Sequence, residues 1–529
     1  MTRRFLAARG ERVALLVLVI ALLASMPLLS AQRPSVDAAF KQFWDAKSPQ
    51  EAANLVPAIV ASGVSFDAAL ARLKQGRAYS PDAPKGVVRL SRKTGDAEFP
   101  YTLDVPPTYD PAKRFQVRVQ LHGGIGRPNA AVRGDGSIGS LAGPGNVDQI
   151  YVLPQSWADA PWWGDVQVGN LRAILDTVRR TYNVDENRVV LAGVSDGGTG
   201  AYFIAMRDTT PYASFLPMNG FMMILQNPSL GLREALLPNN LRNKPFFVIN
   251  GGQDPLYPAS IVEPYVRHLE KNGVSVDFRP QPDAGHNTAW WPQMKDTVEA
   301  FVTGHPRDSH PATLTWSAEE GVGTRAHWLV IDALGPRRIA APLPDLNDFA
   351  AGAELNFGVR SNGMRLTSVI PGSNADVLGL EPGDRVLAIN GRSLPGELDL
   401  LQFLGIYDSG ERLTFSISRD NKPLDVAGVY KPEILTRLVP LFARDRPTGR
   451  VDVVREGNMV RATTRGVASF TLLVSPDAFD LAQPITIVAD GRQVFSARTE
   501  KSVATLMKWA AIDNDRTMLY AAEIHVRLE

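Results

Sequence analysis

A serine stands in a glycine-rich turn near the middle of the sequence. Ser195 lies in the segment 193–197 (GVSDG), which directly follows the apolar run 189–192 (VVLA) and precedes a helix-compatible run. This order predicts a strand, a sharp turn and a helix. Glycine at positions 193 and 197 indicates that neighbouring backbone passes so close that a larger side chain would clash. A hydroxyl in such a turn becomes a nucleophile when a neighbouring base removes its proton.

A carboxylate and an imidazole follow farther along the chain. Asp254 comes after a predicted strand and the turn 250–252 (NGG), and His286 lies in a loop after another extended run. Near neutral pH an imidazole can take the proton of a hydroxyl and later give it to a leaving group. Asp254 would orient the imidazole, whereas we interpret the nearby Asp283 as a loop cap. The predicted catalytic residues are therefore Ser195, Asp254 and His286.

Two glycines follow the predicted strand 115–121, upstream of the serine. The backbone N–H groups of Gly123 or Gly124, with that of Asp196, are predicted to form an oxyanion hole, which holds the negative charge that develops on a substrate carbonyl. We expect His122 to shape this loop rather than to act as the base. The remaining histidines have no comparable turn or acid beside them: His268, His305, His310, His327 and His525.

The order serine, acid, histidine and the strand–turn–helix context resemble the α/β-hydrolase superfamily over about 86–304. The most similar branch is that of secreted esterases, depolymerases and prolyl-oligopeptidase-like enzymes. This resemblance implies an acyl-enzyme on Ser195 that water then hydrolyses. Strands spaced by helices predict, independently, an α/β fold with a mostly parallel sheet and flanking helices.

Two tryptophan pairs lie on loops expected at the carboxyl ends of these strands, where ligands bind in open α/β sheets. The residues are Trp162, Trp163, Trp290 and Trp291. They are candidates for the walls of a substrate pocket, and packing in the core is the equal alternative, since large aromatic side chains are often buried.

The region 348–432 differs in character and resembles a PDZ domain of bacterial type. The segments that carry the resemblance are 355–358 (LNFG), 371–375 (PGSNA) and 379–391 (GLEPGDRVLAING). The resemblance implies that Asn356, Phe357 and Gly358 form a carboxylate-binding loop, where a peptide C-terminus would add itself to the edge of the sheet. A spacer domain with an idle groove is the alternative.

Strand-like patterns flank this region on both sides. The first flank alone supplies too few strands for an independent core, so we expect one β-sandwich-like region with the PDZ domain inserted in it. The pairs Asn390-Gly391 and Asp490-Gly491 predict two-residue hairpin turns.

The first 31 residues have the pattern of a secretory signal peptide. Four arginines precede the apolar run 13–24, Pro27 interrupts the apolar stretch, and small residues follow at 30–31. An uncleaved membrane anchor is the alternative. In either case the protein is expected to act outside the cytoplasm, as a secreted or periplasmic protein.

A chain of 529 residues is too long for one hydrophobic core. The predicted division is a signal peptide at 1–31, a helical lead-in at 32–85, an α/β-hydrolase catalytic domain at 86–304, the first part of the sandwich at 305–347, the PDZ domain at 348–432 and the second part of the sandwich at 433–529. Whether the lead-in forms a lid over the catalytic residues stays open.

Composition narrows the function further. The 56 basic and 55 acidic residues nearly cancel, so no nucleic-acid partner is expected, and the lack of cysteine excludes disulfides and a cysteine nucleophile. No histidine pair has metal-site spacing, so we expect neither metal nor cofactor. We interpret the chain as an exported carboxylic-ester hydrolase. A serine peptidase of the prolyl-oligopeptidase-like type and a PDZ-based binding protein with an inactive hydrolase domain are the alternatives.

Overall fold

The computed structural model describes most of the chain outside its N-terminus. The described residues are 35–95, 97–126, 137–338, 343–351, 357–394, 400–404, 406–431, 437–443 and 446–528. The predicted signal peptide at 1–31 lies outside them. Within the described part, no helix has both the length and the apolar character that a membrane span requires.

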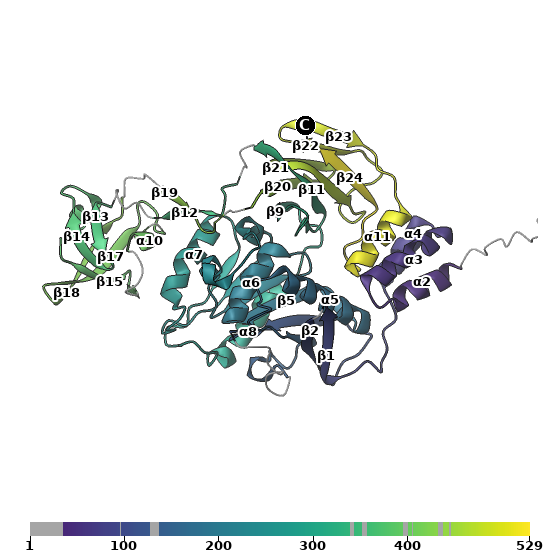
Figure 1. Ribbon diagram of the computed structural model, residues 1–529, viewed down its shortest axis with the longest axis horizontal. Helices are drawn as coiled ribbons and strands as arrows, with labels where there is room; N and C mark the ends of the chain where they lie inside the picture. The colour runs from purple at the N-terminus through teal and green to yellow at the C-terminus, as the bar shows by residue number, and fades with distance from the viewer. Residues whose placement is uncertain are drawn as a thin grey trace, which may run out of the picture.

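An eight-stranded sheet forms the centre of the molecule (Figure 1). Its order is β1-β2-β4-β3-β5-β6-β7-β8, in which β2 is antiparallel to both β1 and β4, and the strands from β4 to β8 in this order are parallel to one another. The strands are β1 Gly86–Thr94, β2 Ala97–Val105, β3 Phe115–Leu121, β4 Gln149–Pro154, β5 Val184–Val194, β6 Ser214–Met218, β7 Phe246–Val248 and β8 Val276–Phe278.

Helices cover both faces of this sheet. Alternate residues of β5 point to opposite sides: Val189 and Leu191 face the cluster with α5, α6 and α7, while Val190 and Ala192 face α8. The predicted α/β fold with a mostly parallel sheet is therefore confirmed. These helices are α5 Asp165–Thr181, α6 Asp196–Arg207, α7 Ala259–Lys271 and α8 Trp291–Gly304, and the short 3-10 turns are η1 Gly139–Leu141, η2 Met222–Gln226, η3 Pro228–Leu230 and η4 Pro238–Asn243.

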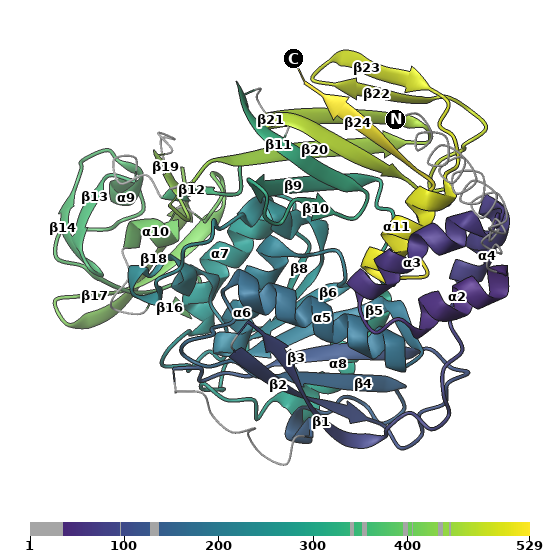
Figure 2. The same ribbon diagram turned by 45° about the vertical axis from the view of Figure 1, so that its right-hand side comes forward.

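The lead-in consists of three helices that pack on a helix from the other end of the chain (Figure 2). Phe40 and Phe43 of the lead-in share a buried cluster with Leu506 and Met507. Arg180, in the last turn of α5, donates to the carbonyl of Ala46 at 2.8 Å. The helices are α2 Val36–Asp45, α3 Pro49–Ala61, α4 Phe66–Gln75 and α11 Val503–Asp513.

The lead-in therefore lies at the amino ends of the parallel strands, because α5 ends there and β5 begins at Val184. Ser195 follows the carboxyl end of β5, at the opposite edge. The lead-in is not a lid over the serine.

The strands before and after the PDZ region form one β unit. β9 pairs with β20, and β11 pairs with β21, so the flanks join across the insertion. The long β21 pairs with β20 and β22 before Gly466 (φ 68) and with β11 and β24 after it, so the sheet bends around a shared core. The strands are β9 Thr313–Glu319, β10 Arg325–Ala326, β11 Leu329–Arg338, β20 Thr448–Glu456, β21 Met459–Val474, β22 Ile485–Ala489, β23 Arg492–Ala497 and β24 Ala522–Arg527.

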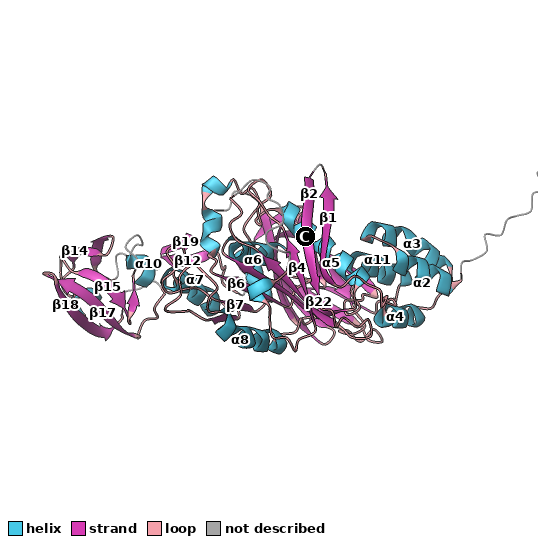
Figure 3. Cartoon of the chain, turned by 90° about the horizontal axis from the view of Figure 1, so that it is seen from below, coloured by secondary structure: helices cyan, strands magenta, loops and turns pink. Residues whose placement is uncertain are grey.

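The PDZ region has its own sheet and core, and it lies at the far end of the molecule from the lead-in (Figure 3). A two-stranded stem, β12 with β19, connects it to the rest of the chain. Its elements are β13 Val359–Asn362, β14 Arg365–Val369, β15 Arg385–Ile389, β16 Arg392–Ser393, β17 Arg412–Arg419, β18 Lys422–Val429, α9 Asn374–Val377 and α10 Leu400–Leu404, and the stem strands are β12 Asp348–Ala351 and β19 Arg437–Pro440.

The predicted carboxylate loop is described only in part. Asn356 lies outside the described residues, Gly358 has φ 82, and Phe357 is buried with its ring 5.7 Å from that of Phe415. Phe357 therefore contributes its side chain to the PDZ core.

Candidate active site

Ser195 occupies a strained turn between β5 and α6. Its backbone has φ 57 and ψ −119, a conformation that L-residues rarely adopt. The glycines around it have no room for a side chain: a Cβ on Gly193 would lie 2.0 Å from the Gly197 carbonyl oxygen, and one on Gly197 would lie 2.3 Å from that of Leu121. The turn therefore raises the serine hydroxyl above the end of the sheet.

Three side chains from separate loops meet at this point. His286 Nε2 lies 2.8 Å from Ser195 Oγ, and His286 Nδ1 lies 2.7 Å from Asp254 Oδ2. The second oxygen of Asp254 accepts the backbone N–H groups of Leu256 and Tyr257 at 2.8 and 3.0 Å. A carboxylate held by these donors accepts from Nδ1–H, so Nε2 carries the lone pair that faces the serine hydroxyl. The structure thus brings the three predicted residues into one hydrogen-bonded chain.

Close backbone contacts place the acid loop beside the histidine loop. A Cβ on Gly251 would lie 2.3 Å from the Ala284 carbonyl oxygen, and one on Gly252 would lie 2.5 Å from that of Pro282. The parallel strands β7 and β8 start these two loops side by side. Asp254 and His286 can therefore meet although 32 positions separate them.

The glycine loop after β3 lies against the serine. A Cβ on Gly123 would be 2.7 Å from the Cβ of Ser195, and Gly124 has φ 65. The carboxylate of Asp196, at the first position of α6, accepts the backbone N–H of Ile125 at 2.9 Å. The loop and the start of α6 are thus held together next to the hydroxyl.

His122 uses both ring nitrogens to shape this loop. Its Nε2 accepts the backbone N–H of Ser156 at 3.1 Å, so Nδ1 carries the proton and donates to the Gly123 carbonyl at 2.9 Å. Trp162 Nε1 donates to the His122 carbonyl at 2.8 Å. His122 is therefore a structural residue of the loop, as the sequence predicted.

The tryptophan pairs are packed in the core. Trp162, Trp163, Trp290 and Trp291 are all buried, and the described residues that line the cavity beside Ser195 include none of them. The interpretation of these residues as pocket walls is wrong. Trp162 and Trp163 pack in the core on one face of the sheet, and Trp290 and Trp291 pack in the core on the other face. Two of them support the site indirectly: Trp162 holds the His122 carbonyl, and Trp291 Nε1 donates to the Ala142 carbonyl at 2.8 Å.

Sequence reasoning missed residues that position the catalytic histidine. The ring of Tyr257 stands edge-on to that of His286 at 5.7 Å. Asn219, at φ 46, donates from Nδ2 to the Asn287 carbonyl at 2.8 Å. Asn250 Nδ2 donates to the Tyr257 carbonyl at 3.2 Å. An asparagine–glycine pair after β6 was the one available signal for Asn219, since asparagine tolerates positive φ.

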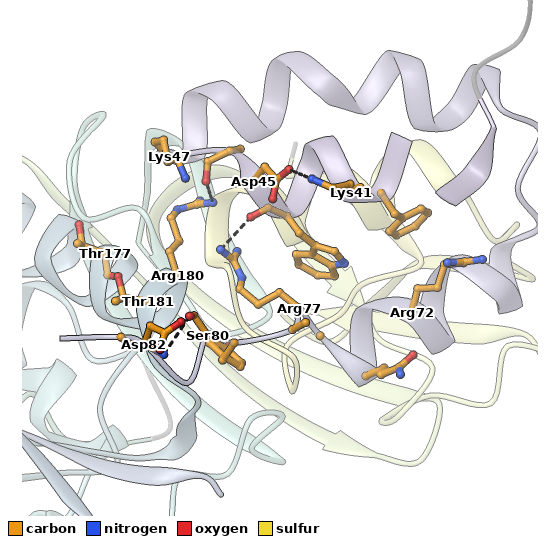
Figure 4. A pocket seen from close by; sticks show the side chains of 18 of the residues that line it. Lys41, Asp45, Lys47, Arg72, Arg77, Ser80, Asp82, Thr177, Arg180 and Thr181 are labelled. Atoms are coloured by element: carbon orange, nitrogen blue, oxygen red, sulfur yellow. Dashed lines mark hydrogen bonds and ion pairs between the residues drawn. The ribbon is translucent and has the colours of Figure 1, made fainter. Parts of the chain in front are cut away.

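Several cavities border the described hydrolase domain, and two of them differ in character. One, of about 270 Å³, lies beside Ser195 and is lined by Gly123, Val194 and Thr288 among others. The larger, of about 970 Å³, lies between the lead-in and the end of α5 (Figure 4). Several of its lining cations are engaged with local carboxylates, as in the pairs Lys41–Asp45 and Arg180–Asp176. Of the two, only the smaller one adjoins the serine.

Other histidines are away from this site. The ring of His268 in α7 bonds the Leu346 carbonyl at 2.9 Å, and burial lowers the pKa of His268. Among the described residues, no group of three histidine or acidic side chains is arranged to hold a metal ion.

Comparisons with known proteins give one family match and a set of similar solved structures. Residues 365–419 match the family model of the PDZ domain. Among solved structures, the chain is similar to a thermostable esterase, with 19% identity and a TM-score of 0.34 over 42% of this chain and 63% of the esterase. It is also similar to fluorophosphonate-binding serine hydrolase F of Staphylococcus aureus, with 16% identity and a TM-score of 0.33 over 41% and 99% of the two chains.

A third similar structure is an S-formylglutathione hydrolase of Agrobacterium tumefaciens, with 15% identity and a TM-score of 0.35 over 43% of this chain and 99% of that one. The match to the thermostable esterase spans less than two thirds of that protein's length. A search of curated proteins finds no match. The fold assignment therefore rests on the topology of the central sheet, and the PDZ assignment on the family match.

Proposed function

We propose that this protein is a serine hydrolase that cleaves carboxylic esters through an acyl-enzyme on Ser195. The observation that carries the proposal is the chain of short contacts from Ser195 Oγ through His286 to the buried carboxylate of Asp254, at 2.8 and 2.7 Å, on a strained strand-to-helix turn. A positioned base and a fixed carboxylate are what a serine hydroxyl needs to become a nucleophile.

The chemistry follows from the geometry. His286 Nε2 takes the proton as Ser195 Oγ attacks the ester carbonyl carbon, and the carbonyl oxygen becomes negative. Backbone N–H groups of Gly123 or Gly124 and of Asp196 would hold that oxygen, and loss of one such donor typically costs about 3–4 kcal/mol. His286 then gives the proton to the leaving alcohol. Water, deprotonated in turn by His286, releases the acid from Ser195.

A covalent probe tests the nucleophile. A fluorophosphonate should label the purified protein and release its leaving group, while Ser195→Ala should not be labelled. Ser229→Ala is the matched control, because Ser229 is exposed on η3 and should leave labelling unchanged. Labelling that persists in Ser195→Ala would refute the assignment. Absence of labelling in all three proteins would favour the binding-protein alternative.

Turnover measurements distinguish an esterase from a peptidase. We expect Ser195-dependent hydrolysis of short-chain nitrophenyl esters to exceed that of nitroanilide amides with the same acyl group. The PDZ match at 365–419 favours the peptidase alternative, since this module presents polypeptide ends to its neighbours. Faster Ser195-dependent cleavage of peptide amides than of esters would replace the esterase proposal with the peptidase.

We also propose that the protein is exported and that its PDZ groove takes a peptide C-terminus. The basic start and apolar run within 1–31 support export. N-terminal sequencing of protein from the cell envelope should begin near residue 32, whereas an intact N-terminus in the membrane fraction would indicate an anchor. To test the groove, peptides are added to the full-length Ser195→Ala variant. Peptides with a free C-terminal carboxylate should bind, and the same peptides with an amidated C-terminus should not.

A further inference from the structure

Two buried glutamines border the cavity beside Ser195. Gln120 lies near the end of β3 and is 7% exposed, and Gln155 follows β4 and is 9% exposed. Leu121, Leu153 and other apolar side chains supply most of the remaining lining. The cavity is thus an apolar pocket that contains a small number of polar groups, which is how selective ligand pockets are built.

The amides of these glutamines make almost no hydrogen bonds to described residues. The only hydrogen bond of the Gln120 amide to a described residue is from Nε2 to the Leu121 carbonyl at 3.5 Å, which is the limit for such a bond. The Gln155 amide has none to any described residue, although its backbone is engaged: its N–H donates to the Pro100 carbonyl at 3.2 Å, and its carbonyl accepts from Gln167 Nε2 at 3.2 Å.

Another buried glutamine shows the usual arrangement. Gln167 is 1% exposed, and its Nε2 donates to the carbonyls of Gln155 and Ala160 while its Oε1 accepts from Asn170 at 3.2 Å. Buried amides are normally satisfied in this way, because an unpaired one costs free energy. The two amides at the cavity can therefore pair with its contents, which are water in the free protein and substrate in the complex.

The position of the cavity indicates which part of an ester enters it. Val194 precedes Ser195, and Gly123 lies against it, so the cavity adjoins the serine on the side of the glycine loop. His286 Nε2, which protonates the leaving alcohol, approaches the serine with a side chain that is 23% exposed to solvent. The alcohol can therefore leave toward solvent, while the acyl chain occupies the cavity.

We infer that the cavity binds the acyl part of the substrate, and that Gln120 and Gln155 select short acyl chains that carry a hydrogen-bonding substituent such as a hydroxyl. This inference rests on the proposed esterase function. The volume of about 270 Å³ lies just below the usual range of about 300–1,000 Å³ for pockets that hold drug-sized ligands, so it suits a short acyl chain. A hydroxyl both donates and accepts, so it can pair with an amide carbonyl and an amide N–H together.

The preference for acyl chains with a hydroxyl over those without one should be large. When a chain without the hydroxyl binds, the polar groups of the site that pair with it are left unpaired. A bound water can restore part of this pairing. We therefore expect a preference of at least about tenfold, below the largest ratios seen for sites that exclude water.

A matched pair of substrates tests the inference. The 4-nitrophenyl esters of 3-hydroxypropanoate and of butanoate differ only in a hydroxyl that replaces a methyl group. After correction for spontaneous hydrolysis, kcat/KM should favour the hydroxypropanoate by at least about tenfold in the wild-type protein. Gln120→Met and Gln155→Met, tested separately, should each bring the ratio close to one or reverse it.

The control is Gln116→Met. Gln116 lies on β3 four residues before Gln120, hence on the same face, and is 3% exposed. Its Nε2 is bonded to Gln149 and Glu299, and it does not border the cavity. Its substitution should leave the ratio unchanged. Because both substrates are measured on one preparation, partial unfolding of any variant does not alter the ratio.

Each outcome has a distinct meaning. Ser195-dependent turnover with equal rates, or with a preference for butanoate, would overturn the inference and leave the hydrolase proposal intact. A preference for the hydroxypropanoate that survives in both glutamine variants would also overturn it. If neither ester is turned over in a Ser195-dependent manner, the proposed function fails and the inference fails with it.

Discussion

Polar side chains form hydrogen-bonded clusters at both ends of the central sheet, but the two clusters differ in exposure. At the carboxyl ends, Ser195 and His286 stay partly exposed, and their shared hydrogen bond is the one that a reaction would break. At the amino ends, the side chains of Arg307 and Asp515 are both 0% exposed and 2.7 Å apart. Both residues lie in the C-terminal β region, and Arg307 also donates to Asn187 and Thr210 of the hydrolase domain, so this cluster joins the two regions.

The partners of Arg307 show what this junction is for. Its guanidinium donates to Asn187, Thr210, Asp515 and Thr517, which come from three different parts of the chain. Although burial alone would raise it, the pKa of Asp515 is held below its usual range by the charge of Arg307. At the carboxyl ends of the strands the polar groups are thus accessible to a substrate. At the amino ends they hold the C-terminal β region against the hydrolase domain. Substitutions at the first end should change activity, and those at the second should change stability.

The largest effect is expected for Asp254→Asn. The asparagine oxygen can still accept from Leu256 and Tyr257, but its NH₂ group would face His286 and favour the wrong tautomer of the imidazole. We expect kcat for an ester to fall by about 10⁴-fold, as in other serine triads, with a change in the free energy of unfolding below about 1 kcal/mol. Steady-state kinetics and denaturant unfolding measure the two quantities.

Asp283→Asn is the control for that substitution, since Asp283 is exposed and only three positions from His286. It should leave kcat unchanged. Loss of activity in Asp283→Asn with normal activity in Asp254→Asn would reverse the assignment of the acid.

The second effect concerns stability. Arg307→Met removes one partner of a buried ion pair and leaves the Asp515 carboxylate without its strongest neighbour, so the free energy of unfolding should fall by about 3–5 kcal/mol. The kcat of the folded fraction should stay the same. The double variant Arg307→Met with Asp515→Leu should recover much of the loss, because it removes the uncompensated charge as well. A single variant as stable as the wild type would show that the junction does not depend on this pair.

The elements of the central sheet could be predicted from the sequence because each strand is a short apolar run bounded by turn residues. The predicted strand at 115–121 coincides with β3, and the apolar run 189–192, also predicted as a strand, lies within β5. Turn chemistry was equally informative. The pairs Asn390-Gly391 and Asp490-Gly491 have positive φ at both residues and join antiparallel strands, which confirms the predicted hairpins.

Contacts between distant segments could not be predicted in this way. The lead-in packs on α11, about 430 positions away, and amphipathic patterns do not specify which surface they cover. The same limit applies to the ring of Tyr257 beside His286, which depends on how two loops approach each other. The positions of the tryptophans in the chain indicated loops near the site. Whether each ring faces a pocket or the core depends on the direction of its side chain, which the sequence does not specify.

The third effect is a pH dependence that belongs to the amino-end junction. Burial lowers the pKa of His310 to about 4, and it lowers that of the fully buried His327 well below its usual value. Above about pH 6.5 both histidines are neutral in the folded and unfolded states. Below about pH 6.5, these histidines bind protons in the unfolded chain but stay neutral in the folded protein. The free energy of unfolding should therefore decrease as pH falls from about 6.5 toward 4, by up to about 1.4 kcal/mol per pH unit for each histidine.

Denaturant unfolding at pH 7, 6 and 5 measures this slope. His310→Gln should reduce it, because it removes one of the protons that the unfolded chain takes up. His525→Gln is the control, since the side chain of His525 is 67% exposed. A slope that is unchanged in His310→Gln would mean that this histidine takes up its proton equally in both states.

The smallest effect is expected where charged groups join two parts of the molecule without burial. Lys271 of α7 and Asp408 of the PDZ domain form an ion pair whose side chains are 64% and 65% exposed. Water and salt screen such a pair, so Asp408→Asn should change the free energy of unfolding by less than about 1 kcal/mol, and less still at high ionic strength. The Arg307–Asp515 pair also joins a basic and an acidic side chain, but both side chains are buried. The two ion pairs therefore differ mainly in burial. If Asp408→Asn destabilised the protein as strongly as Arg307→Met, charge alone would account for the anchoring, and burial would not be what distinguishes the two junctions.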